Sequence, residues 1–255
     1  MGNISFFAIT TIIKHRLVEY FKEYNYTIIS PLVGNLLFII IFVTIDHYYS
    51  IKIEEKNFIE FIIPGLILIA VAQESFDNAS NTLINMKQIG SFNDYLSAPI
   101  SRIEILFAFL FSSILIGIFL ALLNFLVFSY FVNFETINII YFIYYLTISI
   151  VFFSSLGCII GFVSYYWDTQ SSVSNFFVIP ISFLSGTFFS INTLHESLKF
   201  ILYYNPYYYV VSNFRSSFYY NFEYEIGNNL LILFFLLIML LSAYYIFYKG
   251  FKVIK

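Results

Sequence analysis

The feature that most constrains this sequence is a series of long stretches without a single charged side chain. Between Glu23 and Asp46 lie 22 residues, none of them Asp, Glu, Lys or Arg. A helix needs about 20 such residues to cross the hydrocarbon core of a bilayer. Further uncharged stretches place candidate spans within 105–134, 136–167, 169–194 and 226–248.

One more span is predicted at residues 61–73, which are apolar and continue as a polar-faced helix past Glu74. Only 11% of the chain is charged and 60% is hydrophobic, whereas a soluble domain carries about 25% charged residues. Membrane barrels show short alternating segments instead of long apolar runs. The prediction is an all-α integral membrane protein, a single transmembrane domain over residues 1–255 with six transmembrane helices.

Lysine and arginine set the orientation, because short loops rich in these residues stay in the cytoplasm. With the N-terminus inside, eight of them fall inside and four outside. The inside group is Lys14, Arg16, Lys22, Lys87, Arg102, Lys249, Lys252 and Lys255; the outside group is Lys52, Lys56, Lys199 and Arg215. We therefore expect a multi-pass protein with both termini in the cytoplasm.

Residues 5–24 are predicted to form an amphipathic interfacial helix, lying on the inner leaflet before the first span. Apolar residues recur there at helical spacing, while charged ones fall mostly on the other side of the helix. The apolar set is Phe6, Ile9, Ile13, Leu17, Phe21 and Tyr24. Amphipathicity serves a membrane anchor and a docking surface equally well, so both remain open.

A second cytoplasmic element covers residues 87–100, where Gly90 and Pro99 punctuate a short amphipathic piece. It is either a plain connecting loop or a docking element. Phe92, Tyr95 and Leu96 are apolar residues that a solvated loop would leave exposed, so we expect another surface to cover them.

Residues 195–225 should lie outside as a short helical hairpin between the fifth and sixth spans. Asn205-Pro206 breaks the helix there, because proline lacks an N–H and disfavours helix at the preceding residue. The rings at 203–220 form an interfacial aromatic belt, or else stack on sugars or hold lipid tails. Arg215 is expected to reach outer headgroups or to pair with Glu223 or Glu225.

The second span carries polar residues at helical spacing on one face: Glu74, Asp77, Asn78, Asn81 and Asn85. Ionisable groups in membrane helices usually face the bundle interior or water. They could line the cytoplasmic mouth of a translocation path, form a proton relay, or mark where the helix leaves the lipid. In the fourth span, Gly157 and Gly161 form a small-residue face for close helix packing, within the protomer or between two.

Enzymatic signatures are absent from the sequence. No glycine precedes a lysine, so the chain has no Walker A loop of its own. The segment "HESLK" at 195–199 ends in lysine where a zinc protease has its second histidine. We expect no catalytic residue, no metal and no cofactor in this chain. The net charge of −3 gives no reason to expect a nucleic-acid partner.

Two motifs resemble the permeases of type-2 ABC exporters, the ABC-2 type transporter family. "NDYLSAPISRIEIL" (93–106) is similar to E-L-L-x-x-P-V-S-R-x-E-I, which follows the second span in that family. The matching positions are Asp94, Leu96, Pro99, Ile100, Ser101 and Arg102. Besides the two motifs, the short segment "FIIPGLI" (61–67) resembles the family's P-G-I/L in the second span.

The second motif, "FLSGTFFSINTLHESLKFILYYNPYYYVVSNFR" (183–215), resembles a longer pattern around the fifth span and the hairpin. Its matching positions are Leu184, Ser185, Gly186, Phe188, Phe189, Leu194, Leu198, Asn205, Pro206, Tyr209, Val211 and Arg215. Ser190 and His195 replace two prolines of that pattern, so the hairpin is expected to enter at a different angle.

The resemblance implies a permease of a bacterial inner (cell) membrane. Such a permease forms a homodimer and pairs with a cytoplasmic ABC ATPase, which holds ATP and magnesium. Its cargo would be a drug, a lipid or a polysaccharide. Docking would then fall to Phe92, Asp94, Tyr95, Leu96, Pro99 and Arg16, with residues 87–100 as the coupling segment. The alternative is a proton-coupled secondary transporter or channel that uses Glu74 and Asp77.

Overall fold

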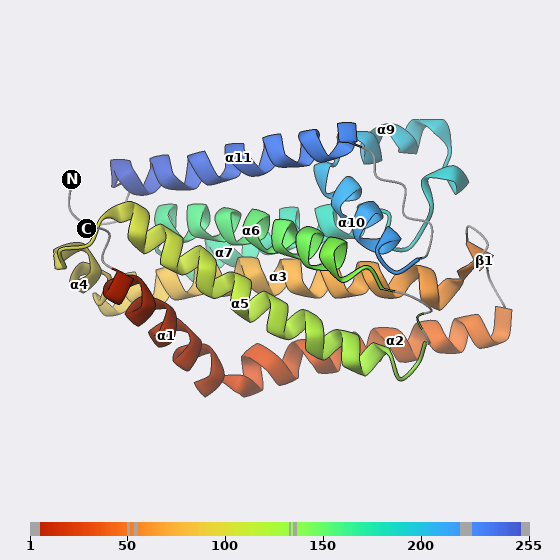
Figure 1. Cartoon of the computed structure of the whole chain (residues 1–255), viewed down its shortest axis with the longest axis horizontal. Coiled ribbons are helices and arrows are strands. Elements are labelled where there is room, and N and C mark those ends of the chain that lie inside the picture. Colours follow the sequence, from red (N-terminus) through yellow and green to blue (C-terminus); the bar gives the residue numbers. More distant parts are fainter. Residues whose placement is uncertain are drawn as a thin grey trace.

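The computed structural model describes residues 6–49, 52–53, 56–132, 134, 137–219 and 226–250, and nearly all of them are helical. The elements in chain order are α1 (Phe6–Lys22), η1 (Asn25–Ile29), α2 (Ser30–Tyr49), β1 (Lys52–Ile53), β2 (Lys56–Asn57), α3 (Phe58–Ile89), α4 (Phe92–Ser97), α5 (Arg102–Phe128), α6 (Ile139–Val163), α7 (Trp167–Val173), η2 (Ser174–Val178), α8 (Ile179–Phe183), η3 (Ile191–Thr193), α9 (Glu196–Tyr204), α10 (Pro206–Ser216) and α11 (Ile226–Lys249). The long helices form an elongated bundle (Figure 1).

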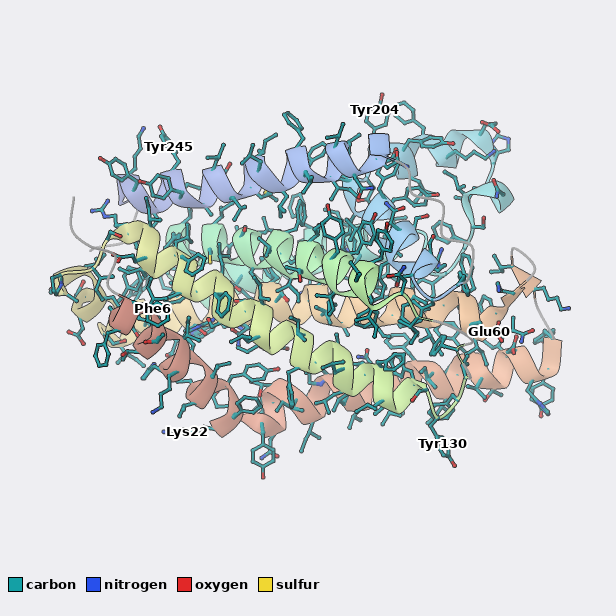
Figure 2. All side chains as sticks on the ribbon, viewed as in Figure 1. Phe6, Lys22, Glu60, Tyr130, Tyr204 and Tyr245 are labelled. Carbon is teal, nitrogen blue, oxygen red and sulfur yellow. The ribbon has the colours of Figure 1, made fainter. Side chains whose placement is uncertain are left out.

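Two ends of this bundle matter for function. We call them the α4 end and the α10 end, after the short helix at each. The side chains of Phe6 and Tyr245 lie toward the α4 end, whereas Glu60, Tyr130 and Tyr204 lie toward the other (Figure 2). The chain therefore begins its first described helix and finishes its last at the same end of the bundle.

Within the residues that the structure describes, five helices are long and apolar enough to cross a membrane: Asn25–Tyr49, Phe58–Ile89, Arg102–Phe128, Ile139–Val163 and Asn228–Lys249. The helix that corresponds to the predicted fifth span, 169–194, is shorter than that range and begins two residues before it. It runs from Trp167 through the π-helical turn η2 to Phe183, about 26 Å at 1.5 Å per residue. The chain then turns at Gly186, whose φ of 74° suits a residue without a Cβ.

Helix α3 forms the centre of the bundle and packs against α6 (Figure 1). Small residues on α6 allow the close approach. A Cβ added at Gly157 would lie 2.5 Å from the carbonyl oxygen of Phe76, and one at Gly161 would lie 2.7 Å from the Cβ of Leu83. The Gly157/Gly161 face therefore serves packing within one protomer, the first of the two alternatives that the sequence left open.

Proline inside α3 is accommodated by a side chain from elsewhere. Pro64 has no N–H to donate to the carbonyl of Glu60, four residues back. The hydroxyl of Tyr219 donates to that carbonyl oxygen at 3.1 Å. Tyr219 thus supplies the donor that Pro64 lacks, and α3 continues without a break.

The corner between α1 and α2 uses the same solution. Pro31 follows the π-helical turn η1 and cannot donate to the carbonyl of Thr27. The hydroxyl of Tyr20 donates to that carbonyl at 2.8 Å, and the Thr27 hydroxyl donates to the carbonyl of Tyr20 at 2.9 Å. These reciprocal bonds fix the angle at which the chain passes from α1 into α2.

Candidate functional site

A polar cavity opens between α1, η1 and the second half of α3. Its volume is about 560 Å³. It is lined by Arg16, Glu19, Tyr20, Lys22, Glu23, Tyr26, Thr27, Glu74, Asp77, Asn78, Asn81, Thr82, Asn85, Met86, Ile89, Ser91 and Trp167. We refer to it as the polar cavity.

Helix α3 supplies the floor of the polar cavity, since Glu74, Asp77, Asn78 and Asn81 all line it. They share one face because they recur at helical spacing. The amide of Gln170, on α7, donates to Asp77 Oδ1 at 2.5 Å. The whole of α3 is about 48 Å long at 1.5 Å per residue, so this polar half reaches well into the bundle from the α4 end.

Arg16 lies inside the protein rather than on a docking surface, which corrects the role predicted for it. Its side chain is 3% exposed. Its Nη2 donates to Asn78 Oδ1 at 2.6 Å, and its guanidinium lies 4.6 Å from the centre of the Phe109 ring. Burial lowers the pKa of Arg16 to about 10, so it is still a cation at neutral pH. The cation thus binds the polar face of α3 from α1.

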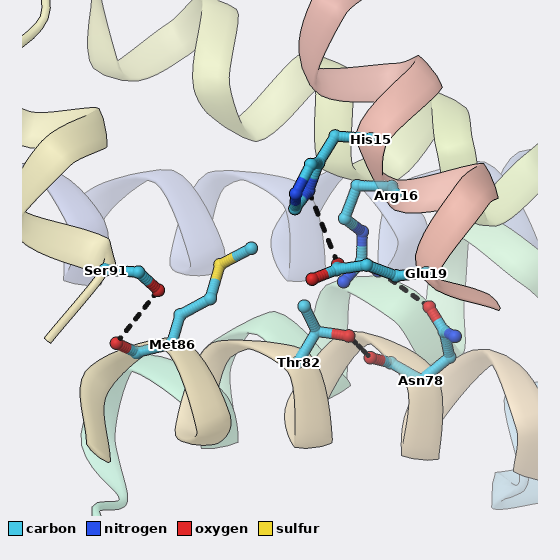
Figure 3. A network of polar contacts seen from close by, with 7 residues as sticks. All are labelled: His15, Arg16, Glu19, Asn78, Thr82, Met86 and Ser91. Atoms are coloured by element: carbon cyan, nitrogen blue, oxygen red, sulfur yellow. Dashed lines mark hydrogen bonds and ion pairs between the residues drawn. The ribbon is translucent and has the colours of Figure 1, made fainter. Parts of the chain in front are cut away.

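Polar contacts near Arg16 connect α1 with α3 (Figure 3). On α1, His15 lies 3.6 Å from Glu19 across one helical turn. On α3, the hydroxyl of Thr82 donates to the backbone carbonyl of Asn78 at 2.8 Å. Of the contacts drawn, the bond between Arg16 and Asn78 is the one that joins the two helices.

Helix α4 follows α3 directly and presents a mixed surface. Asp94 and Pro99 are exposed, and Tyr95 and Leu96 are partly exposed. Phe92 was predicted to dock a partner, but it is 1% exposed, with ring centres 6.3 Å from Phe162 and 6.0 Å from Phe247. We correct that role: Phe92 is a core residue that anchors α4 to α6 and α11.

A groove of about 520 Å³ runs between α1 and α4, and we call it the elbow groove. It is lined by Phe7, Ala8, Thr11, Ile12, His15, Glu19, Met86, Ser91, Asp94, Tyr95, Ala98 and Ile100. Two of the residues predicted for docking, Asp94 and Tyr95, belong to it. The elbow groove thus combines the two elements that the sequence predicted to be cytoplasmic.

Two cations flank α4 and bind the ends of other helices. Lys87 Nζ donates to the carbonyls of Phe162 (3.1 Å) and Ser164 at the end of α6. Arg102 Nη1 donates to the carbonyls of Phe247 (3.4 Å) and Tyr248 near the end of α11. The last carbonyls of a helix have no partner within it and favour a positive charge. The segment around α4 is therefore attached to both α6 and α11.

The sequence also contains a helix-start signal that the predictions did not include. Ser101 and Glu104 form a capping box at the start of α5, in which the Ser101 N–H donates to Glu104 Oε2 at 2.7 Å. The spacing S-x-x-E is the usual signature of such a start. The capping box therefore fixes the start of α5 at Arg102, directly after the turn that contains Pro99.

At the α10 end, Asn205 joins two elements. Its Oδ1 accepts from the Tyr207 N–H at 3.0 Å, which caps α10, and Pro206 takes the first helical position. Its Nδ2 donates to the carbonyls of Ile181 and Leu184, each at 3.0 Å. The helix break predicted at Asn205-Pro206 is confirmed, because α9 ends at Tyr204 and α10 begins at Pro206.

Arg215 corrects another prediction, because it does not extend to headgroups. It is 8% exposed, and its guanidinium lies 3.7 Å from the centre of the Phe61 ring. Nε donates to the carbonyl of Phe61 at 3.0 Å, and Nη2 donates to that of Gly186 at 2.6 Å. Glu223 and Glu225, its other predicted partners, lie outside the described residues, as do positions 220–225 of the predicted hairpin.

The aromatic cluster is divided between core and surface, so an aromatic belt explains only part of it. Tyr207 and Phe218 are each 1% exposed and Phe214 is fully buried. Tyr203 and Tyr204 are exposed, and the hydroxyl of Tyr209 donates to the Tyr203 carbonyl at 3.1 Å. Residue type alone did not separate these two groups, because tyrosines occur in both.

Comparisons with known proteins match this chain to membrane transport proteins. A family model described as ABC-2 type transporter matches residues 8–219. The chain is 23% identical over 218 residues to a protein named inner membrane transport permease YadH of Escherichia coli K12, covering 86% of this chain and 85% of that protein. The protein of the same name from Shigella flexneri matches with the same identity and coverage.

Proposed function

This chain belongs to the ABC-2 type transporter family, and we propose that it is the membrane-spanning subunit of an ATP-driven exporter. A separate cytoplasmic ABC ATPase would bind ATP and magnesium. The cargo would be a drug-like molecule, a lipid or a polysaccharide that leaves the cytoplasm. The relatives' name, inner membrane transport permease, supports a place in a bacterial inner membrane.

The observation that carries this proposal is the construction of the α4 end. A short helix with an exposed face stands beside the elbow groove, where a partner can contact α1 and α4 together. Lys87 and Arg102 attach the same segment to the ends of α6 and α11. A displacement of α4 by a partner would therefore act directly on two long helices.

The polar cavity is our candidate for the cytoplasmic mouth of the path. Glu74, Asp77, Asn78 and Asn81 give it a hydrogen-bonding surface at a depth where lipid offers none. Two copies of the chain would enclose the path between their spans. Helices α2 and α11 have the surface for this, since only 6% and 17% of their most apolar stretches are buried within one copy.

We count six crossings in this arrangement. Five are the long apolar helices, and the sixth is the helix from Trp167 to Phe183, whose length lies at the lower limit of about 17 residues for a span. An even number of crossings agrees with α1 and α11 meeting at one end of the bundle. The excess of Lys and Arg on that side then makes it cytoplasmic.

Co-purification tests the proposal. The chain is co-expressed with a candidate cytoplasmic ABC ATPase, and we expect a stable complex whose ATP hydrolysis drives transport in liposomes. Tyr95→Asp in the elbow groove should uncouple hydrolysis from transport while insertion into the membrane is unchanged. Asn93→Asp is the matched control, with the same charge on an exposed position of the same helix. Transport by the chain alone, without nucleotide or partner, would refute the proposal.

A second function is favoured by one observation, the presence of two neighbouring carboxylates on the α3 face of the polar cavity. Glu74 and Asp77 could carry protons in a secondary transporter or channel. In that case efflux would follow an imposed proton gradient, and Glu74→Gln with Asp77→Asn would abolish it. ATP-dependent transport that ignores the gradient would exclude this alternative.

A further inference from the structure

A second groove lies on the outer flank of α1, against α5. It has a volume of about 580 Å³, and its walls are almost entirely apolar. It is lined by Thr10, Ile13, Lys14, Leu17, Val18, Phe21, Lys22 and Phe111. We call it the flank groove, and it is distinct from the elbow groove, which lies on another side of α1.

Helix α1 turns two different faces to its surroundings. Ile12, Arg16 and Tyr20 are buried against the bundle. On the flank groove, Val18 is 43% and Phe21 is 44% exposed, and Phe111 on α5 is 39% exposed. A face that exposes large apolar side chains beside a candidate membrane span is suited to acyl chains.

Lysines border this apolar surface. Lys14 and Lys22 are exposed, and among the described residues neither forms an ion pair. The residues that line the flank groove include no carboxylate, and Glu19 faces His15 instead. The lysines are eight residues apart, about 12 Å along the helix, so their long flexible side chains can approach one phosphate between them.

We propose that the flank groove binds one anionic phospholipid of the inner leaflet. Its acyl chains would lie on Leu17, Phe21 and Phe111, and Lys14 and Lys22 would hold its phosphate. The positive charge of the rim favours an anionic lipid, because a lipid without net charge would gain little from binding beside two lysines. α1 is not among the helices able to span a membrane, and an interfacial helix places lysines at the depth of headgroups.

This site does not depend on the transport function proposed above. Lys22 also lines the polar cavity, so the headgroup would lie beside the opening of that cavity. A bound lipid there would hold α1 in place independently of any ATPase.

Native mass spectrometry of the purified full chain tests the site, with phosphatidylglycerol and phosphatidylcholine as probes. We expect one tightly held phosphatidylglycerol and no comparable phosphatidylcholine. The double variant Lys14→Gln/Lys22→Gln should bind phosphatidylglycerol about 25-fold more weakly, since a lysine near an anionic surface contributes about fivefold. Lys249→Gln is the control, a cation on α11 outside the groove.

A second variant tests the apolar part of the site. Val18→Trp fills the flank groove at an exposed position and leaves both lysines unchanged, so it should also displace the lipid. Equal binding of the two lipids, or undiminished phosphatidylglycerol binding in both variants, would overturn the proposal. So would a change in oligomeric mass without a change in lipid binding, because the groove would then hold a second copy of the chain. Competition by soluble glycerol phosphate alone would likewise exclude a lipid site.

Discussion

At both ends of the bundle, an arginine binds polar groups of other segments, and a tyrosine hydroxyl donates to a carbonyl that a proline leaves without its helical donor. At the α10 end these are Arg215 on the carbonyls of Phe61 and Gly186, and Tyr219 on the carbonyl freed by Pro64. At the α4 end they are Arg16 on the side chain of Asn78 and Tyr20 on the carbonyl of Thr27, which Pro31 frees.

The surroundings of the two arginines differ. Arg215 contacts backbone carbonyls and the Phe61 ring in a segment packed with buried aromatic residues. Arg16 contacts an amide that borders a cavity of about 560 Å³. Water can replace a lost partner in the polar cavity, whereas a buried carbonyl at the α10 end has no substitute. The comparison predicts a rigid α10 end and an α4 end that can rearrange.

The largest effect is expected for Arg215→Met. The variant keeps the apolar stem and loses hydrogen bonds from a charged group, each of which contributes about 1.5–3 kcal/mol. The free energy of unfolding, measured by SDS titration in mixed micelles, should fall by about 3 kcal/mol or more. The free energy of unfolding of Arg215→Lys should lie between those of the unchanged protein and Arg215→Met, because lysine keeps the charge but cannot reproduce the fork of donors. An unchanged unfolding curve for Arg215→Met would remove the contrast between the ends.

Arg16→Met should cost less, about 1–2 kcal/mol in the same titration, since water can reach Asn78 from the polar cavity. The loss would concern the attachment of α1 to α3. A cost as large as that of Arg215→Met would show that the α4 end is as tightly closed as the other.

The tyrosines provide a finer comparison. Removing one hydroxyl with Tyr219→Phe should cost about 1 kcal/mol, and Tyr20→Phe about 0.5 kcal/mol, close to the mean for membrane hydrogen bonds. Tyr130→Phe is the control. Tyr130 is 89% exposed, so removing its hydroxyl should leave the free energy of unfolding unchanged. If Tyr20→Phe lowers the free energy of unfolding more than Tyr219→Phe does, the α4 end is the more rigid of the two, contrary to the prediction.

The smallest effect tests the cause directly with a double-mutant cycle. Pro64→Ala restores the N–H that can donate to the Glu60 carbonyl, so this carbonyl needs Tyr219 less. The cost of Tyr219→Phe should therefore fall by about 0.5 kcal/mol in the Pro64→Ala background. Additive costs would mean that Tyr219 stabilises α3 for some reason other than the proline.

Much of this architecture follows from the sequence, because lipid demands long uncharged helices and proline marks where they are interrupted. On these grounds the sequence predicted a span before Asp46 and a helix break at Asn205-Pro206. Helix α2 occupies the first position, and α10 begins at the second. The polar spacing from Glu74 to Asn81 likewise predicted one shared helix face, which lines the polar cavity.

Burial of individual side chains could not be predicted in the same way. Arg16, Phe92 and Arg215 were all assigned to surfaces, and all three are buried. Their partners come from helices distant in the sequence, such as Asn78 for Arg16 and Phe247 for Phe92. A single helix pattern shows which residues share a face, but not which other helix covers that face.

Helix α2 contacts the rest of the bundle through one narrow face. Asn35 Nδ2 donates to Asn124 Oδ1 at 2.7 Å, Ile39 is buried, and the centre of the Phe42 ring lies 5.8 Å from that of Phe58. Only 6% of its most apolar stretch is shielded by its own chain. The surroundings of α2 therefore depend on the medium. Detergent, native lipid and a second copy of the chain would each give this helix a different set of neighbours. Measurements on solubilised protein should accordingly be repeated in a bilayer before the tilt or exchange behaviour of this helix is assigned to the chain itself.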